Sequence, residues 1–172
     1  MDPLQPLDGK GIRNENVTAF RYALVECDGM DIDRQNALIR ELELPVACLV
    51  HSGGKSVHAI VHIDAPDYPE YRKRVEYLYT VCRKNGLELD QQNRNPSRLS
   101  RMPGVLRKGH KQFLIDTNIG KTDFAEWREF IESATDDLRP GEHERGLGRD
   151  AAAGTGTYRR RAPAGAQDAA RR

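Results

Sequence analysis

Residues 51–64 of the chain read HSGGKSVHAIVHID, a glycine turn followed by a segment that alternates residue by residue. The Gly-Gly-Lys-Ser at residues 53–56 matches the end of a phosphate-binding P-loop, whose full pattern requires a glycine at residue 49 and a helix after the serine. Residue 49 is a leucine, and the alternation is typical of a strand. The fragment is therefore not a P-loop, and it predicts a turn between two strands.

The strands joined by this turn are expected at Val46–Val50 and Lys55–Asp64, and so short a connection predicts antiparallel pairing. One face of the second strand is apolar: Val57, Ala59, Val61 and Ile63. Ser56 and His58 lie two residues apart on the opposite face. A histidine there is a candidate to hold a phosphate or to act as an acid or base, and a structural histidine is the alternative.

Periodicity around this hairpin predicts the other elements. A strand is expected over residues 17–28, helices over 31–44, 66–86 and 121–134, and short strands at 87–90 and 110–116. Asp31 is the expected N-cap of the first helix, and Gly86 the stop of the second. The pattern indicates an α/β (α+β) fold, with a mixed, mainly antiparallel sheet and helices packed on one side.

Composition limits the classes of protein. The chain has 172 residues, 38% hydrophobic and 31% charged, with a net charge of +1, which allows one domain with a core and excludes a polycation. No apolar run approaches ~18 residues, so no membrane span is expected, and no signal peptide is recognised. Cys27, Cys48 and Cys82 are widely spaced and predict reduced, buried cysteines of a cytoplasmic protein rather than a zinc site.

Changes in composition predict three segments. Residues 1–16 are rich in Pro, Gly and Asn and are expected to be a flexible leader. Residues 17–137 contain all the predicted elements and form the expected folded domain. Residues 138–172 are rich in Arg, Ala and Gly with few large apolar side chains, so we expect a disordered tail.

Two carboxylates end the first predicted strand. Glu26 and Asp28 share a face, and the period of two places them within ~7 Å, close enough to share divalent cations. The apolar residues before them indicate the end of a core strand. An exposed strand end running into a turn is the alternative.

A third carboxylate precedes a basic loop. Asp90 ends the predicted strand at 87–90, and the run that follows contains no acid as far as residue 115. Its cations are Arg94, Arg98, Arg101, Arg107, Lys108 and Lys111. Arginine donates two hydrogen bonds at once to a phosphate, while a solvated loop is the alternative. Three carboxylates that hold two metals, with cations around a triphosphate, form the kind of site that joins nucleotides.

These motifs, in this order, resemble the archaeo-eukaryotic primase superfamily, the primase-polymerases, and more narrowly their phage and plasmid types. The first family motif is similar to ALVECD at residues 23–28, the second to SGGKSVHA at 52–59, and the third to LELD with NPSRLSRMPGVLR at 87–107. The resemblance extends over residues 16–131. It implies an RRM-like catalytic core and a DNA primase or template-directed nucleotidyltransferase.

The resemblance also implies roles for individual residues. Glu26, Asp28 and Asp90 would bind two Mg²⁺ or Mn²⁺ ions and, with His58, form the catalytic set. The residues expected to contact the nucleotide phosphates or the template are Lys55, Ser56, His58, Arg98, Arg101 and Lys108. The implied partners are a single-stranded DNA template, an NTP or dNTP, and a separate replicative helicase or ATPase.

Three further interpretations stay open. The chain is interpreted either as a stand-alone catalytic domain or as a truncated form without a helicase domain. The same sheet and basic loop would also suit a non-catalytic module that binds single-stranded nucleic acid or a replication origin. A hydrolase that uses the same metals is a more distant alternative.

Overall fold

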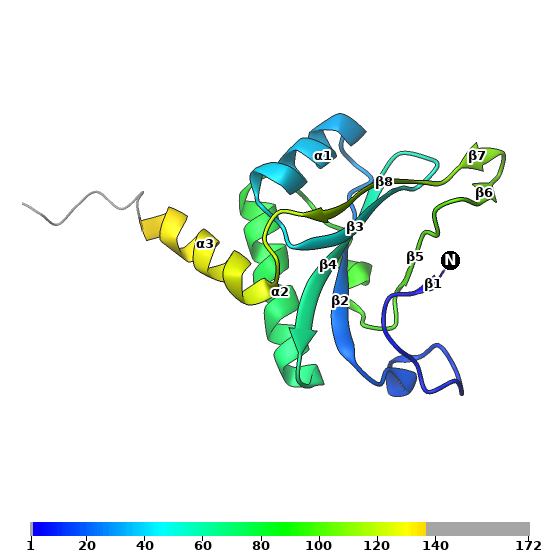
Figure 1. Cartoon of the computed structure of the whole chain (residues 1–172), viewed down its shortest axis with the longest axis horizontal. Helices are drawn as coiled ribbons and strands as arrows, with labels where there is room; N and C mark the ends of the chain where they lie inside the picture. The colour runs from blue at the N-terminus through cyan, green and yellow to red at the C-terminus, as the bar shows by residue number, and fades with distance from the viewer. Residues whose placement is uncertain (1, 137–172) are drawn as a thin grey trace, which may run out of the picture. The chain divides into compact units, whose positions relative to one another are not determined.

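The computed structural model describes residues 2–136, and the predicted tail at 138–172 lies outside the described residues (Figure 1). A four-stranded antiparallel sheet has the order β2 (Phe20–Val25), β4 (Val57–Ala65), β3 (Val46–His51), β8 (Phe113–Ile119). The helices are α1 (Ile32–Glu41), α2 (Tyr68–Lys84) and α3 (Phe124–Asp136). They lie on one side of the sheet, as predicted (Figure 1).

Shorter elements lie around the other face of the sheet. Strand β1 (Asp2–Pro3) pairs with β5 (Leu99–Ser100), and β6 (Leu106–Arg107) pairs with β7 (His110–Lys111). Two 3₁₀ helices, η1 (Asn14–Asn16) and η2 (Gln91–Arg94), complete the described residues. The β6–β7 pair extends beyond the end of the sheet (Figure 1).

The hairpin predicted from HSGG is confirmed. Strands β3 and β4 pair antiparallel, with His51 opposite Val57 and Val50 opposite His58. The alternating apolar residues of β4 are buried in the core with one stripe of α2: Tyr71, Val75, Leu78, Tyr79 and Cys82. Because directly opposite residues share a face, His58 and Val50 lie on the face away from the helices.

Helix ends follow the capping chemistry of the sequence. The Asp31 side chain accepts hydrogen bonds from the amides of Asp33 and Arg34 at 2.9 and 3.3 Å, so its predicted N-cap role is confirmed. Gly86 has a φ of +84°, the left-handed conformation that ends a helix. The start of α1 and the end of α2 therefore lie where local chemistry favours them.

The prediction of a strand at residues 87–90 is wrong. Leu87 and Leu89 are buried beside β2, but the backbone joins β2 by one hydrogen bond only, from the amide of Asp90 to the carbonyl of Glu26 at 3.2 Å. The chain then turns into η2, with Asp90 as its N-cap, before a ladder can form. Counted as an edge, this segment gives the order 87–90, β2, β4, β3 of an RRM-like core, and β8 extends it.

The strand predicted at 110–116 is divided. His110–Lys111 pairs with β6, Gln112 is buried, and Phe113 begins β8, which continues to Ile119. Alternation alone gives no sign of this division, because the β6–β7 pairing depends on a turn at Lys108 and Gly109, inside the predicted basic loop.

Residues 3–16, expected to form a flexible leader, contact the edge of the sheet. The register of β2 against β4 shifts between Phe20 and Tyr22. The side chain of Gln5 fills this irregularity, accepting from the amides of Arg21 and Tyr22 at 2.7 and 3.2 Å and donating to the Tyr22 carbonyl. Gln5 is buried, and Leu7 bridges to Val17. The leader therefore supplies the hydrogen bonds that a bulged strand leaves unpaired.

Two expectations from composition concern the described residues as well. No helix within residues 2–136 combines the length and apolar character needed to cross a bilayer. Cys27 and Cys82 are buried free cysteines, whereas Cys48 is only partly buried.

Candidate functional site

A cleft of about 450 Å³ opens on the face of the sheet that the helices leave free. It is lined by six residues expected to act together: Glu26, Asp28, His58, Asp90, Arg98 and Arg101. They come from the end of β2, from β4, from the start of η2 and from the region of β5. Segments more than 70 residues apart in sequence thus meet at one place, because β2 lies between β4 and residues 87–90.

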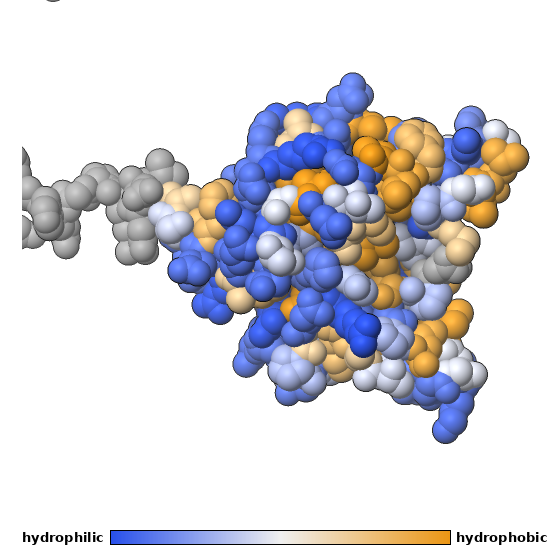
Figure 2. Space-filling view, viewed as in Figure 1, coloured by the Kyte–Doolittle hydropathy of each residue, from blue (hydrophilic) through white to orange (hydrophobic). Residues whose placement is uncertain are grey.

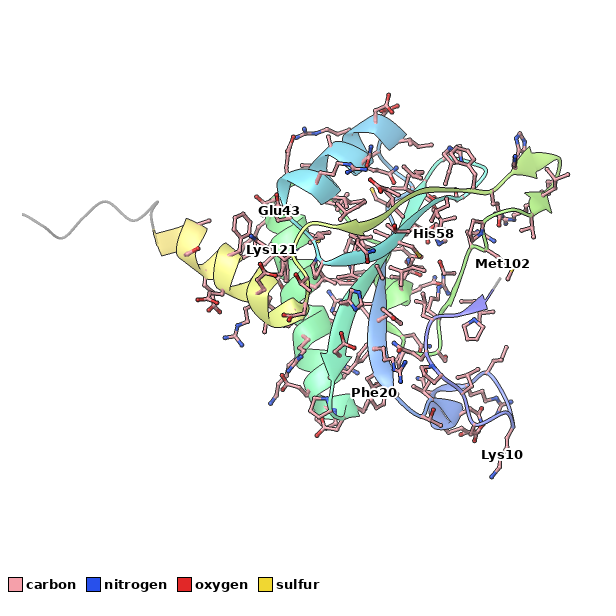
Figure 3. All side chains as sticks on the ribbon, in the orientation of Figure 1. Lys10, Phe20, Glu43, His58, Met102 and Lys121 are labelled. Carbon is pink, nitrogen blue, oxygen red and sulfur yellow. The ribbon has the colours of Figure 1, made fainter. Side chains whose placement is uncertain are left out.

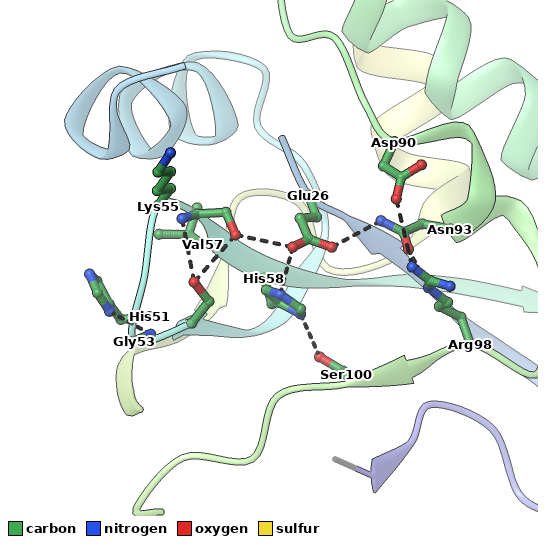
Figure 4. Close-up of polar contacts among 12 residues, drawn as sticks. Glu26, His51, Gly53, Lys55, Val57, His58, Asp90, Asn93, Arg98 and Ser100 are labelled. Atoms are coloured by element: carbon green, nitrogen blue, oxygen red, sulfur yellow. Dashed lines mark hydrogen bonds and ion pairs between the residues drawn. The ribbon is translucent and has the colours of Figure 1, made fainter. Parts of the chain in front are cut away.

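Glu26 is the centre of a hydrogen-bond network in this cleft (Figure 4). Its Oε1 accepts from Ser56 Oγ at 3.0 Å and lies 3.0 Å from His58 Nε2, while Oε2 accepts from Asn93 Nδ2 at 3.1 Å. The Ser-x-His pair therefore holds a carboxylate, and one residue of the predicted metal set is largely occupied by protein donors.

The network continues on both sides of Glu26. Asn93 Oδ1 accepts from Arg98 Nε at 2.6 Å, and the Arg98 guanidinium lies 3.6 Å from Asp90 Oδ2. His58 Nδ1 lies 3.2 Å from Ser100 Oγ. Asn93 and Ser100 are buried, and sequence reasoning did not single out either of them as a site residue. Their only signal was position, within the basic segment that follows Asp90.

One nitrogen donor at the cleft, Arg101 Nε, is buried without a hydrogen-bond acceptor in the described residues. His58 Nε2, by contrast, lies 3.0 Å from Glu26 Oε1, so that carboxylate is its partner. A buried donor left unpaired costs about 1–3 kcal/mol. Arg101 lines the cleft, so an anionic ligand there would remove that cost.

The electrostatics of the cleft agree with this. Burial would raise the pKa of Glu26, but hydrogen bonds from His58, Asn93 and Ser56 and the charge of His58 lower it to about 2. Burial lowers the pKa of Arg101, the charge of Arg107 adds to this, and the charges of Glu26 and Asp28 oppose it. Arginine stays protonated all the same, and a bound anion would further stabilise its charge.

The pKa of Glu26 predicts acid sensitivity. Its value falls from 4.5 to about 2 on folding, so its contribution to stability is complete above pH 4.5 and is lost as the pH falls toward 2. Above that window we expect Glu26→Gln to lower the free energy of unfolding by roughly 2–3 kcal/mol, with the difference shrinking in acid. Urea unfolding between pH 7 and 3 measures it. Glu129→Gln, an exposed glutamate outside any ion pair in residues 2–136, is the control, and equal pH slopes for both variants would refute the assignment.

The three carboxylates predicted to bind metal lie at one cleft but differ in what they contact. Glu26, Asp28 and Asp90 line the same cleft, yet within residues 2–136 no group of three His, Cys, Asp or Glu side chains could hold a metal ion. Glu26 is occupied by protein donors, whereas Asp28 is exposed and makes no ion pair or side-chain hydrogen bond in the described residues. An ion held by protein alone is therefore not supported. Mg²⁺ in nucleotide sites needs only one or two carboxylates in addition to substrate phosphates, which Asp28 and Asp90 fit.

Three predicted phosphate ligands do not line this cleft. Ser56 is buried beneath it, where it bonds to Glu26. The side chain of Lys55 is directed toward α1 and away from Glu26 (Figure 4), and its carbonyl accepts from Gln35 at 3.2 Å. Lys108 lies on the projecting β6–β7 pair. Of the predicted phosphate ligands, His58, Arg98 and Arg101 line the cleft, whereas Lys55, Ser56 and Lys108 do not.

Comparisons with known proteins give information on the fold. No protein-family model matches the chain, and no curated protein matches it. Among solved structures, the AEP domain of the primase-polymerase (PrimPol) of cyanophage S-2L is similar, with a TM-score of 0.56 and 23% sequence identity. The match covers 69% of this chain and 64% of that one, so the chain spans less than two thirds of the matched domain. The chain thus has the fold of the archaeo-eukaryotic primase domain that its motifs resemble.

Proposed function

We propose that this cleft binds a nucleoside triphosphate and that the chain is a template-directed nucleotidyltransferase, a DNA primase of phage or plasmid replication. The observation that carries the proposal is the buried Arg101 Nε, which has no acceptor in the described residues, in a cleft that also contains His58, Arg98 and carboxylates. A cleft lined by both cations and carboxylates suits a triphosphate whose transfer depends on positioning and charge neutralisation.

Each residue has a defined part in this proposal. Arg101 donates to phosphate oxygens, and His58 and Arg98 line the same cleft. Two residues hold His58 in place: Glu26 contacts its Nε2 atom, and Ser100 contacts its Nδ1 atom. Asp28 and Asp90 are the carboxylates that remain for Mg²⁺ or Mn²⁺ brought with the nucleotide. When bound, such ions favour ionisation of the attacking 3′-hydroxyl and neutralise charge on the leaving pyrophosphate. A single-stranded DNA template is the proposed partner, while a separate helicase and a truncated origin stay predictions from the family resemblance.

A primer-synthesis assay tests the proposal. Purified protein is incubated with single-stranded DNA, either ribonucleotides or deoxyribonucleotides, and Mg²⁺ or Mn²⁺. We expect extended or newly initiated chains that require template, nucleotide and divalent ion, and that disappear with EDTA. Template-independent products, or none with any combination while fluorescent nucleotide also fails to bind, would refute it.

A non-catalytic module for single-stranded nucleic acid or a replication origin is the second candidate. The unpaired cations of the β6–β7 region favour it, since they lie outside the cleft. It predicts salt-sensitive DNA binding without nucleotide binding and without dependence on divalent ions. The same purified protein distinguishes the two candidates.

A further inference from the structure

Residues 104–112, here called the basic hairpin, project from the sheet shortly after Arg98 and Arg101, which line the cleft. Backbone bonds from Gly104 to Gln112 at 2.8 Å and from Gln112 to Val105 at 2.9 Å close its base. Leu106 pairs with Lys111, and Arg107 with His110. Lys108 and Gly109 have φ values of +50° and +80°, a type I′ turn of two residues. The segment is therefore an ordered β-ribbon.

The base of the basic hairpin is fixed to the turn that precedes Ser56 and His58. Gly53 has a φ of +74°, and a Cβ on it would lie 3.3 Å from Gln112 Cγ and from two hairpin carbonyl oxygens. Gln112 is buried at this contact. The close packing explains the glycine of the HSGG turn and sets the hairpin at a defined position relative to the strand that bears His58.

The charges of the basic hairpin have no counter-ion among residues 2–136. Arg107, Lys108, His110 and Lys111 are exposed, and none makes an ion pair or side-chain hydrogen bond within residues 2–136. By contrast, Arg94 and Arg98 of the preceding segment both pair with carboxylates. The three cations among them, Arg107, Lys108 and Lys111, repel one another on a short ribbon, and a polyanion would neutralise them.

Apolar side chains are interspersed with these charges. Leu106 is 72% exposed and Val105 41% exposed, and Met102 on the approach to the hairpin is 44% exposed (Figure 3). Figure 2 shows apolar and hydrophilic residues side by side on this projection. Cations next to exposed apolar groups suit a strand with unpaired bases, because its phosphates and its base faces are both accessible.

Lys108 adopts a strained conformation for its type. A non-glycine residue with φ above zero is uncommon, and asparagine tolerates this region better than lysine. The lysine therefore costs stability at the hairpin tip, where its side chain is exposed. Strain kept at a surface position points to a role for the side chain outside the fold.

We infer that the basic hairpin binds the phosphate backbone of a single-stranded DNA outside the cleft. Under the proposed function, on which this inference builds, that strand is the template, held beside the nucleotide pocket by Arg107, Lys108 and Lys111. The strand passes from the hairpin toward Arg101, which lines the cleft. The contact is with backbone and therefore independent of sequence.

The test is direct binding of a fluorescein-labelled 20-mer of deoxythymidine, followed by anisotropy at several salt concentrations with EDTA present. The variant R107Q/K108N/K111Q removes three charges, and asparagine suits the left-handed turn. We expect at least a tenfold loss of affinity at about 0.1 M salt, and a slope of log affinity against log salt smaller by about 2. The matched control K73Q/R83Q/K84N removes the same net charge from exposed positions of α2 and should bind like the unmodified protein.

Several outcomes would overturn the inference. Unmodified protein that fails to bind the oligonucleotide, a hairpin variant that binds as well, or a control that loses as much would each exclude a hairpin site. A blunt 20-base-pair duplex that binds as tightly, and is equally weakened by the hairpin changes, would replace the single strand by a duplex, since a β-ribbon also fits the major groove. Because EDTA and the absence of nucleotide exclude catalysis, the result does not depend on the primer-synthesis assay.

Discussion

Replacing Asp28 by asparagine should abolish template-dependent nucleotide incorporation while the protein stays folded. Asp28 is exposed, lines the cleft, and makes no ion pair or side-chain hydrogen bond in the described residues. Removing its charge therefore costs the fold little, within about 0.5 kcal/mol. Of the carboxylates in the cleft it is the one that no protein donor holds, so it is free to act on a bound nucleotide or its ions.

The expected loss of incorporation is about 100-fold or more, the scale seen when one charge-stabilising group is removed from an active site. Initial rates on a primed template measure it, with urea unfolding to verify the fold. Glu88→Gln is the matched control, because Glu88 is an exposed acid close by on the segment before Asp90 but does not line the cleft. An Asp28→Asn protein that retains synthesis would end the proposed role of this residue. Loss in both variants would indicate a general effect of charge.

Glu26 should behave differently from Asp28, and the difference reveals their roles. Its oxygens accept from Ser56 and Asn93 and contact His58, so a change at Glu26 disturbs stability as well as activity. A pure metal ligand would show the reverse balance. Comparing unfolding and incorporation for both variants separates a residue that positions His58 from one that acts on the substrate.

Much of the fold could be predicted from local sequence patterns. The alternation after HSGG predicts the hairpin and the face of His58, because a period of two leaves one choice once the apolar side is buried. Asp31 and Gly86 mark helix ends through short-range chemistry that a single sequence displays. The gathering of Glu26, His58 and Asp90 at one cleft was expected from the family resemblance and from strand ends, and the geometry is consistent with it.

What pattern could not give depends on tertiary contacts. Nothing in QQNRN distinguishes Asn93, which is buried only because η2 turns it beneath Glu26. The direction of Lys55 depends on how α1 packs beside the turn. Residues 87–90 have the alternation of a strand and the position of one, yet the ladder ends after a single bond because Asp90 caps η2. In each case a long-range partner decides the outcome.

Replacing Trp127 by alanine should lower the free energy of unfolding by about 3–5 kcal/mol, the range for removing a large buried aromatic side chain. Trp127 is fully buried, and its rings lie 5.7 Å from Tyr77 and 5.6 Å from Phe124. Its Nε1 donates to the Leu42 carbonyl at 2.8 Å, so the change also leaves a buried acceptor unpaired. Circular dichroism during urea unfolding measures this without the tryptophan signal, which the variant lacks because Trp127 is the chain's one tryptophan.

Trp127 connects α3, through the end of α1, to the strand that lies beside His58. Its partner Leu42 ends α1, and Leu44 and Pro45 then lead into β3, the strand that pairs with His58 through Val50. Trp127→Phe, which keeps an aromatic ring but no N–H, should lose less than alanine. Phe130→Ala on the same helix, where the ring is only partly buried, should lose least. If alanine at 127 costs no more than alanine at 130, α3 is not docked through its tryptophan, and the support it gives to β3 must come from elsewhere.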